Sequence, residues 1–160
     1  TVPEDTAMAF DGSGSSDNVG IVSYVWKFMD VTPQILMGVN PTYAFTAPGI
    51  YSVTLTVSDT AGNSAVDEVI ITVLTPEERT QRLIETIESW KLPKGTKNSL
   101  TSKLKEAIHL LNIGKEKGAI MKLTDFISQV ESLLNSNRLT LEQANYLITE
   151  AEGIINNIQE

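Results

Sequence analysis

The sequence contains no cysteine among its 160 residues, and this absence excludes several kinds of chemistry. Without thiols there is no disulfide, no zinc site built on thiolates and no thiol nucleophile. The one histidine, His109, has no carboxylate or serine at a diagnostic spacing, which indicates a surface residue rather than a catalyst. The sequence also lacks a phosphate-binding loop, a nucleophile elbow and a catalytic pair of carboxylates. We therefore predict that this chain is not an enzyme and requires no cofactor.

Positive charge is scarce in the first half of the chain. Residues 1–74 hold one cation, Lys27, against eight acids, whereas residues 75–160 hold eleven cations against twelve acids. The two balances, −7 and −1, add up to the net charge of −8. An acidic half without a basic stripe repels nucleic acid and anionic membranes, so we expect no nucleic-acid partner.

Long apolar runs are missing as well. None reaches the length of a membrane span, and no signal peptide is visible, so we expect no membrane insertion within this sequence. The chain starts at Thr1 without a methionine, and we interpret it as a fragment of a longer, processed protein. Any targeting segment or anchor would then lie outside it.

A period of two in hydrophobicity runs through residues 1–74 and predicts β-strands. The clearest case is residues 51–58, where Tyr51, Val53, Leu55 and Val57 alternate with Ser and Thr, between turn residues on both sides. Other alternating segments are residues 8–10, 22–28 and 69–73, and we expect Val69, Ile71 and Val73 to point inward. Short strands between turns predict an all-β, immunoglobulin-like sandwich.

Residues 29–42 interrupt this pattern. They contain Pro33, Gly38 and Pro41, which oppose regular strand pairing, so we predict an irregular segment.

From residue 75 onward the hydrophobic period changes from two to about 3.6, which predicts α-helices. Thr75-Pro76-Glu77-Glu78 and Thr140-Leu141-Glu142-Gln143 both have the form of a capping box at the start of a helix. Apolar stripes of helical spacing occupy four segments separated by short polar breaks. We predict an all-α, antiparallel four-helix bundle over residues 75–160, following a β domain over residues 1–74.

The first half resembles the polycystic kidney disease (PKD) domain, an immunoglobulin-like sandwich. The matching pieces are FDGSGSSDNVGIVSYVWKF at Phe10–Phe28, NPTYAFTAPGIYSVTLTVSDTAGNSA at Asn40–Ala65, and the last alternating strand. Together they cover most of residues 6–73.

The sequence departs from the family in two places. After the second strand the family reads Trp-Asp-Phe-Gly-Asp-Gly, whereas residues 26–31 read Trp-Lys-Phe-Met-Asp-Val, so we expect this loop to fold differently. The family's first strand is expected to precede residue 1 and to be mostly truncated here. Its absence would leave one sheet edge uncovered and prone to pair with another chain.

The second half is similar to the FIMAH helical domain of archaeal and bacterial surface proteins. The segments that carry this resemblance are LPKGTKNSL, Gly118-Ala119-Ile120 with Phe126-Ile127, and Gln143-Ala144 with Ala151 and Ile154-Ile155. The pairing of the two domains implies a non-catalytic module of a prokaryotic cell-surface or secreted protein, hence an extracellular location.

The loops at residues 12–19 and 59–63 are expected at the same end of the sandwich. This would bring Asp17, Asn18 and Asp59 together as oxygen ligands for calcium. Some PKD-like domains of secreted collagenases bind calcium at this end, so the resemblance adds support for the same site. Alternatively, these side chains satisfy their own turns, as Asp and Asn beside Gly commonly do.

Two functions remain open. The first is a structural or interaction module, such as a spacer, an adhesion element or a surface-layer component, with other protein domains or surface polysaccharide as partners. The second is an accessory region that presents a polysaccharide or protein substrate to a secreted hydrolase. An exposed aromatic row would favour the second function, but Tyr24, Trp26, Phe28 and Tyr51 fall at inward positions. Oligomerisation through the helices is a third option, for which only Ile113 and Met121 lie off the main stripes.

Overall fold

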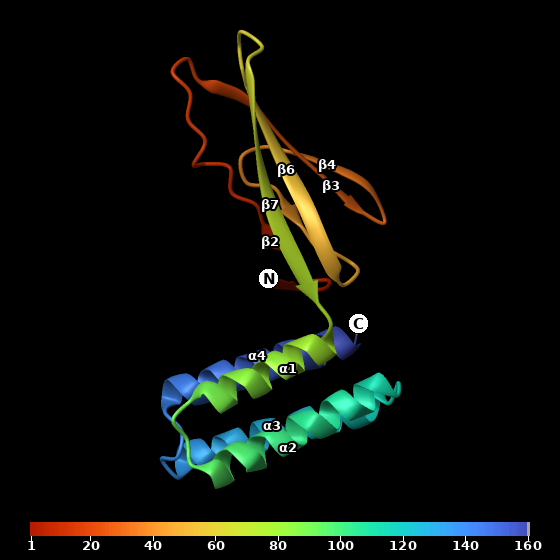
Figure 1. Ribbon diagram of the computed structural model, residues 1–160, viewed down its shortest axis with the longest axis vertical. Helices are drawn as coiled ribbons and strands as arrows, with labels where there is room; N and C mark the ends of the chain where they lie inside the picture. Colours follow the sequence, from red (N-terminus) through yellow and green to blue (C-terminus); the bar gives the residue numbers. More distant parts are fainter. Residues whose placement is uncertain (160) are drawn as a thin grey trace. The chain divides into compact units, whose positions relative to one another are not determined.

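The computed structural model describes residues 1–159 and divides the chain into two compact units, Thr1–Leu74 and Thr75–Glu160 (Figure 1). The first unit, called the β unit below, contains all the strands. The second, called the helical unit, contains the four helices. Both predicted fold classes are therefore confirmed.

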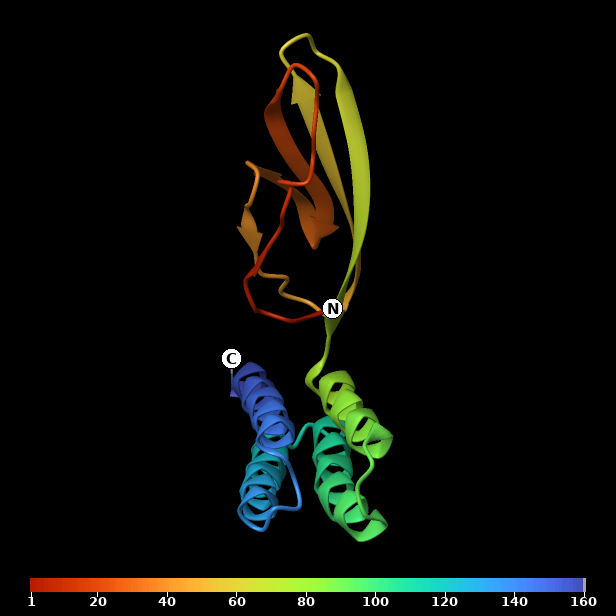
Figure 2. The same ribbon diagram turned by 90° about the vertical axis from the view of Figure 1, so that its left-hand side faces the viewer.

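The β unit consists of two sheets of unequal size (Figure 2). The larger has the strand order β1-β7-β6-β3-β4, and the smaller pairs β2 with β5. All pairs are antiparallel except β1 with β7. The strands are β1 (Val2–Pro3), β2 (Met8–Ala9), β3 (Ile21–Asp30), β4 (Thr32–Met37), β5 (Thr42–Tyr43), β6 (Gly49–Asp59) and β7 (Ser64–Leu74).

Aromatic side chains fill the space between the two sheets. Alternation along β3 directs Trp26 and Phe28 inward, where Phe10 stacks on Trp26 with ring centroids 5.1 Å apart. Phe45, which is completely buried, joins the same cluster beside Phe28 and Tyr51. The inward aromatic positions read from the sequence are thus confirmed.

The segment from residue 29 to 42 is more regular than the sequence indicated. β4 pairs with β3 from Asp30↔Thr32 to Val25↔Met37, so the prediction of an irregular segment is wrong. Pro33 is tolerated because β4 is an edge strand and needs a partner on one side only. Val31 makes the tight turn with a φ of 55°, in the left-handed region that glycine favours. Val31 therefore adopts a backbone conformation that glycine usually takes.

The strand at the start of the chain is only two residues long. β1 runs parallel to β7, with Val2 opposite Val73 and Pro3 opposite Leu74. It covers only the last two residues of β7. Within the described residues, no strand lies beside the outer edge of β7 from Ser64 to Thr72, so this edge is uncovered as expected.

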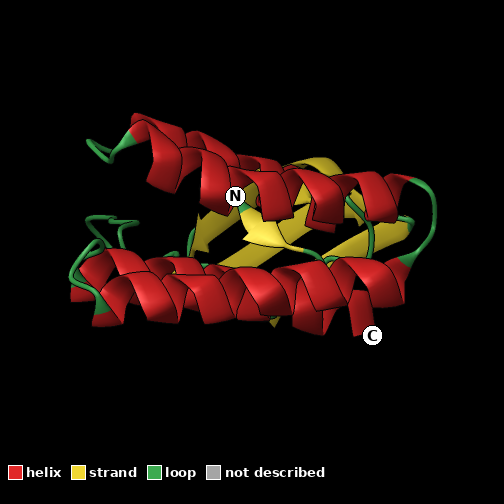
Figure 3. Ribbon diagram, turned by 90° about the horizontal axis from the view of Figure 1, so that it is seen from below, coloured by secondary structure: helices red, strands yellow, loops and turns green. Residues whose placement is uncertain are grey.

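The helical unit contains α1 (Pro76–Ser89), α2 (Lys94–Asn112), α3 (Glu116–Asn135) and α4 (Leu141–Gln159) (Figure 3). The first capping box is formed: Glu78 N donates to Thr75 Oγ1, and Thr75 N donates to Glu78 Oε2, both at 3.1 Å. The second is formed by Thr140 and Gln143, at 3.0 and 3.2 Å. These reciprocal bonds satisfy amide groups that a helix start leaves without partners.

Each helix packs against two neighbours, α1 and α3 each lying between α2 and α4. The apolar stripes predicted from the sequence meet in an apolar core that is almost completely buried. Its largest fully buried members are Leu83, Ile87, Leu100, Leu104, Leu123, Phe126, Val130, Leu147 and Ile154. His109 is exposed on α2, in agreement with its interpretation as a surface residue.

Candidate functional site

The loops that were predicted to carry a calcium site do meet in part. Asp17 and Asp59 line the same shallow pocket of about 130 Å³, together with Ser16 and Asn63. Asn18, the third predicted ligand, is exposed and is not among the lining residues. The structure therefore brings two of the three side chains together.

Both carboxylates already accept hydrogen bonds from their own turns. Asp17 Oδ1 accepts from the amides of Val19 and Gly20, at 2.7 and 3.0 Å. Asp59 Oδ1 accepts from the amides of Ala61 and Asn63, at 2.8 and 2.9 Å, and Oδ2 accepts from Asn63 Nδ2 at 2.7 Å.

The hydrogen bond from the Asn63 side chain is the main cause that lowers the pKa of Asp59, and the turn amides act in the same direction. Within the described part of the chain, no group of three or more His, Cys, Asp or Glu residues is placed to hold a metal ion. The contacts favour turn stabilisation, and calcium binding at Asp17, Asn18 and Asp59 stays a prediction.

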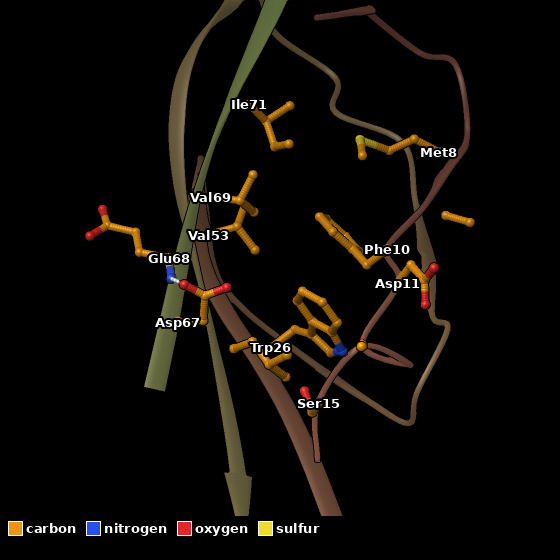
Figure 4. Close-up of a pocket in the computed structure, with 14 residues that line it drawn as sticks. Met8, Phe10, Asp11, Ser15, Trp26, Val53, Asp67, Glu68, Val69 and Ile71 are labelled. Atoms are coloured by element: carbon orange, nitrogen blue, oxygen red, sulfur yellow. Dashed lines mark hydrogen bonds between the residues drawn. The ribbon is translucent and has the colours of Figure 1, made fainter. Parts of the chain in front are cut away.

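A larger concave site lies along the opening between β2 and β7 (Figure 4). This seam groove has a volume of about 610 Å³. Val53, Val69 and Ile71 point into it from the large sheet, opposite Met8 and Phe10, while the Glu68 side chain points away. It opens because the smaller sheet has only two short strands, β2 and β5, which leave Val69 42% exposed although it points inward.

The seam groove combines an apolar floor with acidic groups. Phe10, Trp26 and Val53 form buried parts of the floor. Asp11 and Asp67 lie at the rim, and Asp11 Oδ1 accepts the Ser13 amide at 2.9 Å. Hydrogen bonds from the Ser13 side chain and amide hold the pKa of Asp11 below its usual value. Its shape and charge suit an extended segment with apolar and cationic side chains.

Sequence reasoning missed this groove. Val69 was assigned to the core from its alternation, but alternation cannot show whether a second sheet reaches far enough to cover a position. One signal was present: Asp67 occupies an inward position in the same alternating series as Val69 and Ile71. A carboxylate at an inward position indicates that water reaches that part of the strand.

Asp30 was also not singled out by the sequence. It is buried at 3% exposure and accepts hydrogen bonds from Tyr43 Oη at 3.0 Å, Tyr51 Oη at 3.3 Å and the Thr46 amide at 3.4 Å. Burial is the main cause that raises the pKa of Tyr43 and Tyr51, and Asp30 adds to it. Because every carboxylate contact is internal, this is a structural network that ties β3 to β5, to β6 and to the segment between them.

The architecture is that of a two-domain protein in which an immunoglobulin-like β-sandwich is followed by a four-helix module. Residues 1–73 match the profile of the PKD domain family, and residues 78–156 match that of the FIMAH domain family. The chain thus consists of a PKD domain followed by a FIMAH domain, as the resemblance implied. Both are non-catalytic modules.

Three comparisons show where similar PKD domains occur. Over 72 residues, or 45% of this chain, the sequence is 35% identical to Collagenase ColA of Bacillus cereus. Over 63 residues, or 39% of this chain, it is 46% identical to the pre-pro-metalloprotease PrtV of Vibrio cholerae. The chain spans 7% of the length of each relative. The crystal structure of the PKD1 domain of PrtV covers 47% of this chain and all of that domain, with 32% identity and a TM-score of 0.36.

In the described residues, no helix is long and apolar enough to cross a membrane.

Proposed function

We propose that this chain is a non-catalytic accessory region of a secreted hydrolase, in which the PKD domain holds an extended segment of a protein substrate. The single observation that carries this proposal is the seam groove beside the uncovered edge of β7. An uncovered strand offers main-chain donors and acceptors to an extended peptide, and the adjoining groove takes its alternate side chains. The occurrence of similar PKD domains in a collagenase and a metalloprotease supports an extracellular protein substrate over other partners.

The inward orientation of the aromatic side chains in the β unit argues against a polysaccharide substrate. Sugars are commonly held on flat aromatic surfaces, but the aromatic residues of the β unit are turned inward, with Trp26 at 4% and Phe28 at 7% exposure. Among the described residues, Tyr146 of the helical unit is the one aromatic residue with a largely exposed side chain. The protein form of the accessory function is therefore favoured.

The test is cosedimentation of the chain with insoluble fibrous collagen, with gelatin beads and with chitin. We expect retention on collagen or gelatin and none on chitin. Val69→Lys, which places a long cation in the groove without changing the buried core, should reduce retention at least about threefold. Thr124→Lys, an exposed change of the same charge on α3, serves as the matched control and should leave it unchanged.

A second candidate function, a spacer or surface-layer element, follows if no polymer retains the chain. The short connection between Leu74 and the first helical residue, Pro76, supports it because few residues separate the two domains. Retention by chitin rather than by protein would contradict the proposal and point to a polysaccharide partner.

A further inference from the structure

The outer face of the large sheet, opposite the aromatic core, carries many apolar side chains. Alternation directs Met29 of β3, Ile35 and Met37 of β4, Ile50 of β6, and Val66 and Ile70 of β7 to this side. Each of them is more than half exposed. On β6 all outward residues except Ile50 are Ser or Thr, so the apolar side chains form one group on β3 and β4 and another on β7. Soluble proteins rarely leave such groups of apolar side chains exposed without a use for them.

Two opposite charges interrupt this outer face, and they lie in one row across the strands. Glu68 of β7 is paired with Thr54 of β6, which is paired with Lys27 of β3. Lys27 is the only cation of residues 1–74. The outer face is therefore close to neutral, whereas the remainder of the β unit is strongly acidic.

We propose that the outer face is the interface through which two copies of this chain form a symmetric dimer. The row places Lys27 and Glu68 at equal distances on either side of β6. A two-fold axis that runs along β6 therefore puts Lys27 of one copy over Glu68 of the second, and the reverse. A symmetric interface needs such a self-complementary surface, in which each contact occurs twice.

The same operation matches the apolar rows. Val66 is paired with Thr56, which is paired with Val25, so Val66 of one copy lies over Val25 of the second. Ile50 lies on the axis itself and meets Ile50 of the second copy. Each charge thus meets its opposite. The outward Ser and Thr residues of β6 meet their own copies on the axis, and Ile35 and Met37 of β4 lie beyond the β7 edge of the second copy.

The area of the outer face sets the strength of this dimer. The three strands that overlap under this operation, β3, β6 and β7, are about ten residues long and about 4.8 Å apart, so they cover roughly 450 Å² per copy. Specific interfaces bury roughly 800 Å² per partner, so this dimer belongs with the small interfaces of weak, reversible complexes. The two acidic chains also repel each other at long range, which salt screens. We expect a reversible dimer with a dissociation constant in the micromolar range at physiological salt.

The test is sedimentation velocity of the full chain over a micromolar concentration series. Lys27→Glu and Glu68→Lys should each weaken the dimer at least about tenfold, because both reciprocal pairs become like-charged. The double variant Lys27→Glu/Glu68→Lys should restore the affinity to within about threefold of the original, since the pairs are re-formed in reverse. Ile50→Asp should abolish the dimer because it puts two carboxylates together on the axis.

The controls separate this effect from net charge. Lys105→Glu and Glu131→Lys change the charge by the same amounts at exposed helix positions and should leave the dimer intact. A chain that stays monomeric throughout would overturn the proposal. A dimer whose dissociation constant is unchanged by Ile50→Asp would also overturn it. So would a dimer that the control charge reversals weaken as much as Lys27→Glu and Glu68→Lys do. A dimer weakened instead by Met121→Ser would place the interface on the helices and equally overturn it.

Discussion

The β unit and the helical unit differ in how completely they bury their apolar side chains. In the helical unit every helix has two packing neighbours, so its stripe is covered, and only Ile113, Met121, Leu141 and Tyr146 remain as large exposed apolar side chains among the described residues. In the β unit the exposed apolar side chains include Val31, Met37 and Ile50, at 84%, 76% and 75% exposure.

This difference follows from the number of layers. A bundle of four helices encloses its core from all sides, whereas the β unit places a five-stranded sheet against a pair of two-residue strands. One face of the large sheet is bare, and the seam groove opens on the other. The helical unit is therefore built for internal stability, and the β unit is the half that offers surface to a partner.

The largest expected effect is a loss of stability in the β unit alone, caused by removing Asp30 from its hydrogen-bond network. Asp30→Ala removes the acceptor of the part-buried Tyr43 hydroxyl and of the Thr46 amide, whereas Tyr51 Oη keeps its hydrogen bond to Ala47 O at 2.6 Å. The change should destabilise the β unit by about 1–3 kcal/mol. Urea unfolding followed by Trp26 fluorescence in a Trp90→Phe background measures this loss. Ellipticity at 222 nm, which reports the helices, should keep its midpoint. A change below about 0.5 kcal/mol would show that the network contributes little to the fold.

The next effect belongs to the helical unit, where Arg79 of α1 lies against Gly153 of α4. Arg79 is buried, pairs with Glu150 at 3.5 Å and donates to Asn157, and a Cβ at residue 153 would meet its Nη2 at 2.8 Å. Gly153→Ala should therefore destabilise the bundle by about 1 kcal/mol, despite the better helix propensity of alanine.

In an Arg79→Ala background the same change should stabilise the bundle by about 0.5–1 kcal/mol, because only the helix propensity remains. Ellipticity at 222 nm during urea unfolding of the four chains completes this double-mutant cycle. An equal effect of Gly153→Ala in both backgrounds would disprove the coupling.

A smaller effect concerns Val31 at the turn between β3 and β4. A β-branched residue at a φ of 55° is strained by about 1–2 kcal/mol. Replacing it with glycine relieves this strain, but the greater conformational freedom of glycine in the unfolded chain offsets part of the stabilisation. Val31→Gly should stabilise the β unit by about 0.5–1 kcal/mol, measured by the same Trp26 fluorescence. Val31→Ala, which keeps a Cβ, is the control and should gain much less.

The smallest effect is the acid dependence of the turn at Asp59. The pKa of Asp59 in the folded state lies below the usual 3.8. Its ionised side chain therefore adds to the free energy of unfolding above pH 3.8, and this stabilisation is lost as the pH falls below that value. Asp59→Asn should flatten this part of the curve of stability against pH.

Thermal unfolding in calcium and in chelator tests the metal site. If the carboxylates only stabilise their turns, the two unfolding midpoints are equal. Bound calcium would raise the midpoint of the original chain and not that of Asp59→Asn.

Local patterns in the sequence predict most of the fold. Strict alternation at Tyr51–Val57 and the capping boxes at Thr75 and Thr140 are local signals, and each was confirmed. β4 was missed because Pro33 argues against a strand, and only its place at the sheet edge removes that objection. The turn at Val31 was missed because its strained φ is imposed by the pairing of β3 with β4.

The candidate sites were harder to read because they depend on what lies opposite. Asp17 and Asp59 were placed at one end by topology, and they do share a pocket. The sequence offered both calcium binding and turn stabilisation for these carboxylates, and only the contacts show that turn amides donate to their oxygens. The seam groove depends on the shortness of β2 and β5, a property of the folded sheets rather than of any single segment.

The parallel pairing of β1 with β7 determines how the β unit responds to mechanical force. Val2 lies beside Val73, so a tension applied between Thr1 and Leu74 pulls the two strands in opposite directions along their common axis. Their hydrogen bonds are then loaded in shear, all at once, instead of opening one after another. Only two residue pairs share this load, so β1 should detach at low force while the antiparallel pairing of β7 with β6 stays intact.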